Sequence, residues 1–146
     1  MGRQEVQTLE GLYDAFNSRD IEGILAGMQP DVVIEETEDL AYAAMLLRVL
    51  GPRFVILSGR YEGHDEVRRL FESVWEIADW FGVQPNEYVE QGNHVVVPLV
   101  LRARSRTTGS EGEAATAHLW DMRDGKAERL RVYADREQAL AVAAES

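Results

Sequence analysis

The sequence predicts an α+β fold: a cone-shaped, curved antiparallel sheet closed by N-terminal helices, with a further helix at the C-terminus. Two observations predict it. The first half of the 146-residue chain has mostly helical periodicity, whereas residues 83–134 alternate as strands do. A long antiparallel sheet also curls because strands twist, and helices that close it leave an inside. Since the chain has no internal repeat and no long linker, we expect a single domain over residues 1–146.

Two helices are expected before the first strand. The first has apolar residues at helical spacing, with Leu12 beside Val6, Leu9, Tyr13 and Phe16. Asp20 can cap a second, short helix that runs to Met28. Pro30 ends this helix because proline disfavours helical geometry at the preceding residue. The β-branched stretch VVIEE at residues 32–36 then predicts a short strand.

Residues 37–60 follow a different pattern. The stretch EDLAYAAMLLRVLG is apolar on nearly every side, so we expect a helix over residues 37–50 that covers the mouth of a cavity. The alternative is a helix packed into the core or into a dimer interface. Gly51 and Pro52 end this helix. The next stretch, RFVILSG, predicts a short strand.

A long helix and four strands complete the chain. GHDEVRRLFESVWEIADWFG predicts a helix over residues 63–82 with an apolar stripe that includes Trp75. Four strands are expected at residues 83–90, 94–106, 113–123 and 126–134. Asp124-Gly125 is the strongest hairpin signal between them. Asp135 can cap a final helix, REQALAVAAE.

Composition excludes several classes of function. The formal net charge of -11 makes nucleic acid and anionic membrane surfaces poor partners. The absence of cysteine excludes disulfides, thiolate nucleophiles and thiolate metal sites. The first residues carry no apolar signal segment, and the apolar run at residues 40–51 is too short to span a bilayer. We therefore expect a cytoplasmic protein.

Strand alternation predicts which side chains point inward. In the last strand these are Leu130, Val132 and Ala134. In the preceding strand, Asp121 marks its own face as the outer one although Leu119 is apolar, which leaves an inward face of Ala114, Thr116, His118, Trp120 and Met122. Small residues, an aromatic ring and a titratable group are typical of a pocket. The alternative is a core histidine hydrogen-bonded to a neighbour.

Glu36 shares a strand face with Val32 and Ile34, so it points inward if they are core residues. A buried carboxylate is costly unless it is paired or neutral, and the alternative places Glu36 at the strand end in water. His64 and His94 are expected to be exposed, and three histidines so scattered do not form a metal motif. The alternation of Arg102, Arg104 and Arg106 predicts a solvated strand face.

Three stretches, LYDAFNSRDIEGILAGMQPDVVIEE, YEGHDEVRRLF and AHLWDMRDGKAERLRVYADREQAL, resemble the SnoaL-like polyketide cyclases. This family lies within the nuclear transport factor two-like, ketosteroid-isomerase-like superfamily. The resemblance implies a cone-shaped barrel with a deep pocket, often in a homodimer. It places Glu36 at the position of a catalytic base and His118 near that of a protonated aspartic acid in an oxyanion hole. The tyrosine of that hole falls on Leu12, with Tyr13 one step off the face.

We therefore expect a cofactor-independent acid/base enzyme of isomerase, cyclase, dehydratase or epoxide hydrolase type, without a metal, that acts on a small apolar oxygenated molecule. Glu36 is the expected base and His118 the hydrogen-bond donor or acid. The expected substrate-binding residues are Trp120, Leu12, Thr116, Leu130 and Val132. The alternatives are a non-catalytic ligand-binding or protein-interaction module and a structural dimer with a filled pocket. The apolar run VVVPLVL predicts a homodimer through the outer face of the sheet.

Overall fold

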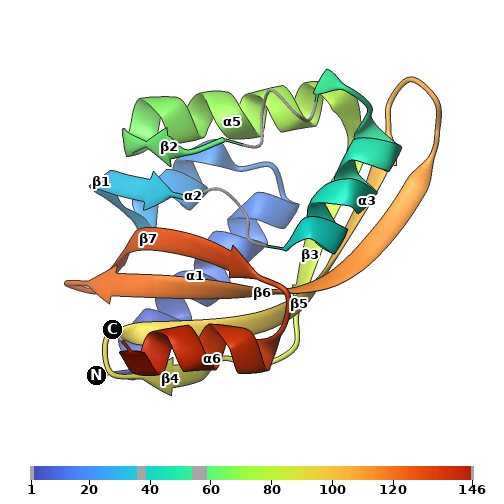
Figure 1. Cartoon of the computed structure of the whole chain (residues 1–146). Coiled ribbons are helices and arrows are strands. Elements are labelled where there is room, and N and C mark those ends of the chain that lie inside the picture. The colour runs from blue at the N-terminus through green and yellow to red at the C-terminus, as the bar shows by residue number, and fades with distance from the viewer. Residues whose placement is uncertain (1, 36–38, 54–58, 146) are drawn as a thin grey trace.

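A computed structural model describes residues 2–35, 39–53 and 59–145 (Figure 1). Glu36 and most of the strand expected at RFVILSG lie outside the described residues. The elements are α1 (Gly2–Asn17), α2 (Ile21–Ala26), β1 (Met28–Ile34), α3 (Leu40–Leu50), β2 (Tyr61–Glu62), α5 (Gly63–Ile77), β3 (Ala78–Pro85), β4 (Val89–Gln91), β5 (His94–Ser105), β6 (Glu111–Arg123), β7 (Lys126–Tyr133) and α6 (Arg136–Glu145).

The strands form one strongly curled sheet in the order β2-β1-β7-β6-β5-β3, and β4 also pairs with β5 (Figure 1). All pairs are antiparallel except β1 with β7, which is parallel. Helices α1, α2, α3 and α5 bury their apolar sides in the main core on the concave face. Helix α6 packs on the other face. The predicted α+β fold with a curled sheet is confirmed, and the parallel β1–β7 pair is the departure from it.

Helix α2 has the expected N-cap but ends earlier than the sequence predicted. Asp20 caps α2 by accepting a hydrogen bond from the backbone N–H of Gly23 at 3.1 Å. Helix α2 ends at Ala26, two residues before the predicted end. The reason is tertiary pairing: Met28 is already opposite Ala127 of β7, so β1 begins there and includes Pro30.

Helix α5 ends at Ile77 and not at Gly82. The chain from Ala78 onward pairs with β5 as strand β3, and this pairing overrides the local helical pattern. Arg106 donates hydrogen bonds to three backbone oxygens at this end, those of Trp75, Glu76 and Ala78. Arg106 therefore satisfies carbonyl groups that the helix end leaves open. It was expected on a solvated strand face, but β5 ends at Ser105 and Arg106 lies in the turn that follows.

Both faces of β6 are buried near its middle. Trp120 and Met122 belong to the main core, whereas Leu119 lies in a second cluster under α6 with Val96, Ala117, Ala139 and Ala143. Helix α6 thus explains why Leu119 is apolar although it lies on the outer face. Helix α6 also covers Val96, an outward-facing residue of the VVVPLVL run. Ala134 was expected to point inward but is exposed, because β7 ends at Tyr133.

Helix α3 packs mainly against β5 and β6 and buries Met45, Leu46, Val49 and Leu50. Gly112 allows this close approach, since a Cβ there would lie 2.7 Å from Val49 Cγ2. The described part of the chain contains no helix that is both long and apolar enough to cross a bilayer.

Candidate functional site

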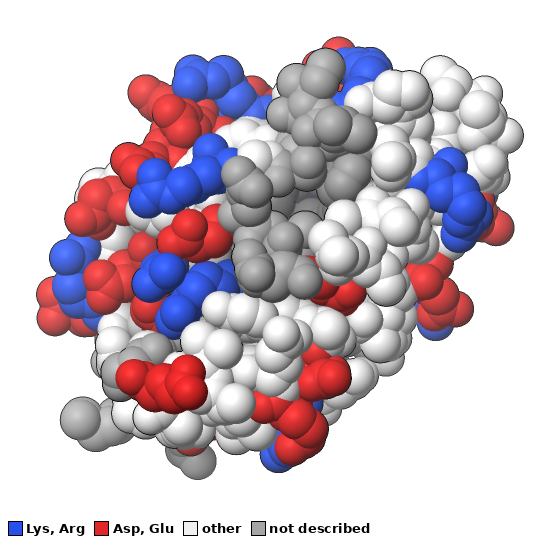
Figure 2. Space-filling view, viewed as in Figure 1, with Lys and Arg blue, Asp and Glu red and all other residues white. Residues whose placement is uncertain are grey.

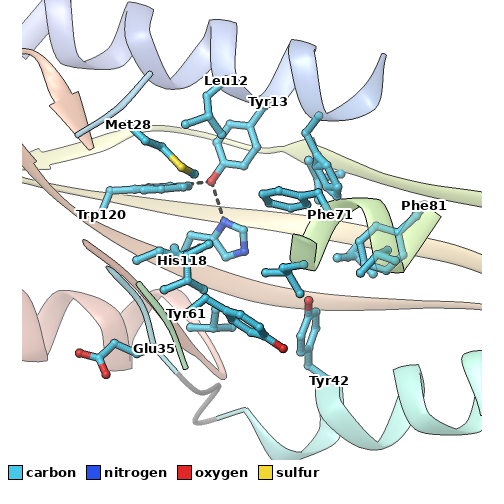
Figure 3. Close-up of a pocket in the computed structure, with 18 of the residues that line it drawn as sticks. Leu12, Tyr13, Met28, Glu35, Tyr42, Tyr61, Phe71, Phe81, His118 and Trp120 are labelled. Carbon is cyan, nitrogen blue, oxygen red and sulfur yellow. Dashed lines mark hydrogen bonds between the residues drawn. The ribbon is translucent and has the colours of Figure 1, made fainter. Parts of the chain in front are cut away.

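A cavity of about 140 Å³ lies inside the curl of the sheet (Figure 3). Its wall is mostly carbon, with aromatic rings from helices and strands that are distant in the sequence: Phe16, Tyr42, Tyr61, Phe71 and Phe81. An apolar wall with few polar groups is typical of sites for small organic molecules.

Most of the expected site residues that the structure describes lie on this wall. They are Leu12, His118, Trp120, Leu130 and Val132. Thr116 is not among the lining residues that the structure describes. Its hydroxyl lies 2.8 Å from Asp39 Oδ2 and 2.9 Å from the backbone oxygen of Tyr133.

Glu35 reaches the wall, but its carboxylate points away from the cavity (Figure 3). This carboxylate pairs with Arg129 at 2.9 Å and with Arg60 at 3.4 Å. Figure 2 shows that the surface over β1, β2 and β7 carries interleaved acidic and basic side chains. Glu35 therefore belongs to this surface network, where its carboxylate is paired with two arginine side chains.

A chain of hydrogen bonds joins three buried side chains at the cavity wall (Figure 3). The indole Nε1–H of Trp120 donates to Tyr13 Oη at 2.8 Å. Tyr13 Oη in turn lies 2.7 Å from His118 Nδ1. The single hydroxyl hydrogen of Tyr13 is satisfied if it is donated to His118 Nδ1. His118 then carries its own proton on Nε2.

Burial determines the charge states of the two titratable side chains in this hydrogen-bonded series, His118 and Tyr13. It lowers the pKa of His118 to about 3, so the imidazole is neutral at pH 7. Burial also raises the pKa of Tyr13 well above its usual value, although the hydrogen bond from Trp120 acts in the opposite direction. His118 Nε2 faces the cavity in Figure 3 and has no hydrogen-bond partner among the described residues. The site therefore presents one oriented donor, a neutral N–H.

Tyr13 is a residue of the cavity wall that the sequence argument did not include among the expected site residues. The helical stripe correctly predicted that Tyr13 is buried, and a buried tyrosine hydroxyl usually needs a partner. Counting positions on the helix placed Leu12 on the pocket face and Tyr13 beside it. The structure places both on the cavity wall.

Two further hydroxyls border the cavity. Tyr42 points its hydroxyl into it from α3 (Figure 3), and burial, together with the charge of Asp39, raises the pKa of Tyr42. Burial also raises the pKa of Tyr61, although a backbone hydrogen bond with Gly59 acts against this. Helix α3 was expected to cover the cavity mouth. It supplies Tyr42 to the wall and buries four other side chains in the core, whereas Leu40 and Leu47 are exposed.

The other two histidines are less exposed than expected. His94 is buried and lies opposite Asp121 in the β5–β6 ladder, with its Nδ1 2.8 Å from Asp121 Oδ1. His64 is half-buried, with its Nε2 3.1 Å from the backbone oxygen of Met28. Within the described ranges, no group of three or more His, Asp or Glu side chains is arranged to hold a metal ion.

Fold and cavity together define a protein of the nuclear transport factor two-like class. The family model described as SnoaL-like domain matches residues 9–130, and the chain belongs to this family. No curated protein sequence matches the chain.

Solved structures agree with this assignment. TerC, co-crystallised with polyporic acid, is 30% identical, covers 98% of this chain and 99% of its own, and has a TM-score of 0.70. An NTF2-like protein of unknown function from Burkholderia pseudomallei is 24% identical over 94% of this chain and 95% of its own, with a TM-score of 0.71. A putative polyketide cyclase from Sinorhizobium meliloti is 17% identical over 86% and 93%, with a TM-score of 0.61. The predicted family is confirmed.

Proposed function

We propose that the protein binds a small apolar oxygenated molecule in this cavity and acts on it as a cofactor-independent acid/base enzyme. The observation that carries this proposal is the neutral N–H of His118, oriented by Tyr13 into an apolar space. A fixed donor in such a space favours negative charge that develops on a carbonyl oxygen. Such negative charge develops when a proton is removed from the carbon beside the carbonyl.

The base in this proposal is Glu36, as the sequence argument suggested. Its neighbours Ile34 and Glu35 line the cavity, which supports a base at this end of β1. Glu36 would take the carbon-bound proton while His118 donates a hydrogen bond to the enolate oxygen. Isomerisation, aldol-type cyclisation and dehydration all begin with this step. The names of two similar proteins, TerC with polyporic acid and a putative polyketide cyclase, fit an oxygenated ligand of this kind.

The test is proton exchange on a simple ketone. Phenylacetone in D₂O should exchange its α-protons faster with the protein than without it, as followed by proton NMR. Glu36→Gln should lower the catalysed rate by about 10²–10⁴-fold, the usual contribution of a general base. The matched control is Glu90→Gln, since Glu90 is exposed on β4. Exchange at the buffer rate, or a rate that Glu36→Gln leaves unchanged, would overturn the enzymatic proposal.

A non-catalytic binding module is the second candidate. It is favoured by the carbon-rich wall, where the only carboxylate that the structure describes, Glu35, is paired with arginines outside the cavity. A computationally designed 17-OHP binder shares the fold at 19% identity with a TM-score of 0.67. Ketone binding that needs His118 but causes no proton exchange would support this candidate over the enzyme.

A further inference from the structure

We propose that Tyr42 is a second ligand-contacting residue, that Thr116 and Asp39 position it, and that the cavity selects a neutral single-ring molecule with oxygens at both ends. This inference rests on the proposed function, because it assigns the class of ligand that His118 binds at the other end.

Helix α3 begins at a buried polar contact with the sheet. Asp39, only 4% exposed, caps the helix by accepting a hydrogen bond from the backbone N–H of Tyr42 at 3.1 Å. The hydroxyl of Thr116 on β6 donates to the other oxygen of this carboxylate at 2.8 Å. A buried carboxylate persists only where hydrogen bonds compensate its lost hydration. The contact therefore holds the first turn of α3 against β6.

This contact determines where the Tyr42 ring lies. Tyr42 is in the first turn of α3, three residues after the cap, and its ring extends from there into the cavity (Figure 3). Thr116 was expected to bind substrate directly. The structure instead makes it a positioning residue, which acts through Asp39 on Tyr42.

Two polar groups thus enter the cavity from different elements, His118 from β6 and Tyr42 from α3 (Figure 3). Within the part of the chain that the structure describes, neither the Tyr42 hydroxyl nor His118 Nε2 has a hydrogen-bond partner. Both residues line the cavity, so these two polar groups are available to polar atoms of a ligand that occupies it. A ligand with two oxygens would pair both.

The size and charge of the cavity restrict this ligand further. A volume of about 140 Å³ is close to that of an engineered apolar cavity that holds benzene, so one ring with small substituents fits. His118 can only donate, so the oxygen beside it is an acceptor such as a carbonyl. Tyr42 can donate or accept, so the second oxygen is a hydroxyl or a carbonyl. No arginine or lysine is among the described lining residues, which favours a neutral molecule.

The experiment compares two probes that differ by one hydroxyl, acetophenone and 4-hydroxyacetophenone, at mildly acidic pH where both are neutral. Calorimetry should show that the wild-type protein prefers 4-hydroxyacetophenone by about 2- to 12-fold, the range expected for one net hydrogen bond. Tyr42→Phe should reduce this ratio to about one and leave acetophenone affinity unchanged. Tyr133→Phe is the matched control, because Tyr133 lies on the outer face under α6.

Two variants test the positioning role. Thr116→Val should lower the ratio although Thr116 does not line the cavity, and Thr116→Ser, which keeps the hydroxyl, should restore it. Circular dichroism checks that each variant is folded. If Thr116→Val does not fold, the ratio measured for Thr116→Ala decides the positioning role in the same way.

The outcomes separate the two proposals. If the preference for 4-hydroxyacetophenone over acetophenone is equal in wild type and Tyr42→Phe, and acetophenone binds through His118, this inference is overturned and the proposed function stands. Acetophenone that does not bind, or that binds equally well to His118→Leu, overturns the proposed function and this inference with it. A ratio unchanged in Thr116→Val overturns the positioning role alone.

Discussion

Replacing Tyr13 by phenylalanine removes one oxygen atom that serves two buried partners. The indole N–H of Trp120, whose side chain is 1% exposed, loses its acceptor, and Nδ1 of His118 loses its donor. Leaving one buried polar group unpaired costs about 1–3 kcal/mol. With two groups left unpaired, we therefore expect Tyr13→Phe to lower the free energy of unfolding by about 2–6 kcal/mol, a large part of the 5–15 kcal/mol typical of a domain.

Urea denaturation followed by circular dichroism measures this loss. The matched control is Tyr88→Phe, because the Tyr88 ring lies 6.3 Å from the Tyr13 ring but is only half-buried. The control should change the free energy of unfolding by less than about 0.5 kcal/mol. A double-variant cycle of Tyr13→Phe with Trp120→Phe should give a coupling energy of about 1 kcal/mol, since both changes remove the same hydrogen bond.

Nitrogen-15 NMR of the His118 ring provides a readout that a purely structural role would not change. In the wild-type protein the proton should lie on Nε2, and Tyr13→Phe should remove the preference for this tautomer. Two results would refute the reasoning: a stability loss below about 0.5 kcal/mol, or a wild-type His118 protonated on Nδ1.

Three other predictions follow from the fold. The pKa of His118 is about 3 in the folded protein, below its ordinary value, so the unfolded chain binds the proton first. The contribution of the neutral His118 to the free energy of unfolding is complete above pH ~6.5. It is lost towards pH 3 by up to about 1.4 kcal/mol per pH unit. Urea titrations at several pH values should show that His118→Leu removes this slope. Gly112→Ala should lower stability by about 1–3 kcal/mol, because the new Cβ would lie 2.7 Å from Val49 Cγ2. The control Gly11→Ala, with open space around it, should be neutral or stabilising in the same assay. Light scattering should give twice the chain mass of 16.4 kDa if the outer sheet face forms a homodimer, and a mass near 16.4 kDa would contradict this.

Much of the fold could be predicted because its determinants are local. Asp20 and Asp135 cap the helices that follow them, and Gly125, with its positive φ of 77°, lies in the turn between β6 and β7 as expected. The boundary between α5 and β3 could not be predicted in the same way. The sequence remains helix-compatible up to Gly82, and the pairing of Ala78 with the distant Ser105 of β5 decides where the helix ends.

The candidate site was predicted only in part, for a related reason. Strand alternation and Asp121 identified the inward face of β6 that carries His118 and Trp120. The contacts of Tyr13 with these residues span 105 and 107 positions, and no local pattern encodes them. The contact of Thr116 with Asp39 spans 77 positions, so alternation placed Thr116 on the correct face without showing what it binds.

The neutral state of His118 limits what chemistry the cavity can perform. To act as an acid, His118 would have to give up the proton on Nε2 and take one on Nδ1 from Tyr13. The pKa of the Tyr13 hydroxyl is already raised well above its usual value by burial, so the tyrosinate that results would be costly. In the proposed reaction His118 would therefore polarise an oxygen by hydrogen bonding and would not transfer a proton to it. The proposed base would meet no charged imidazole at neutral pH, because His118 is neutral there. The pH dependence of turnover should then report the ionisation of the base alone, with no limb from His118 near neutral pH.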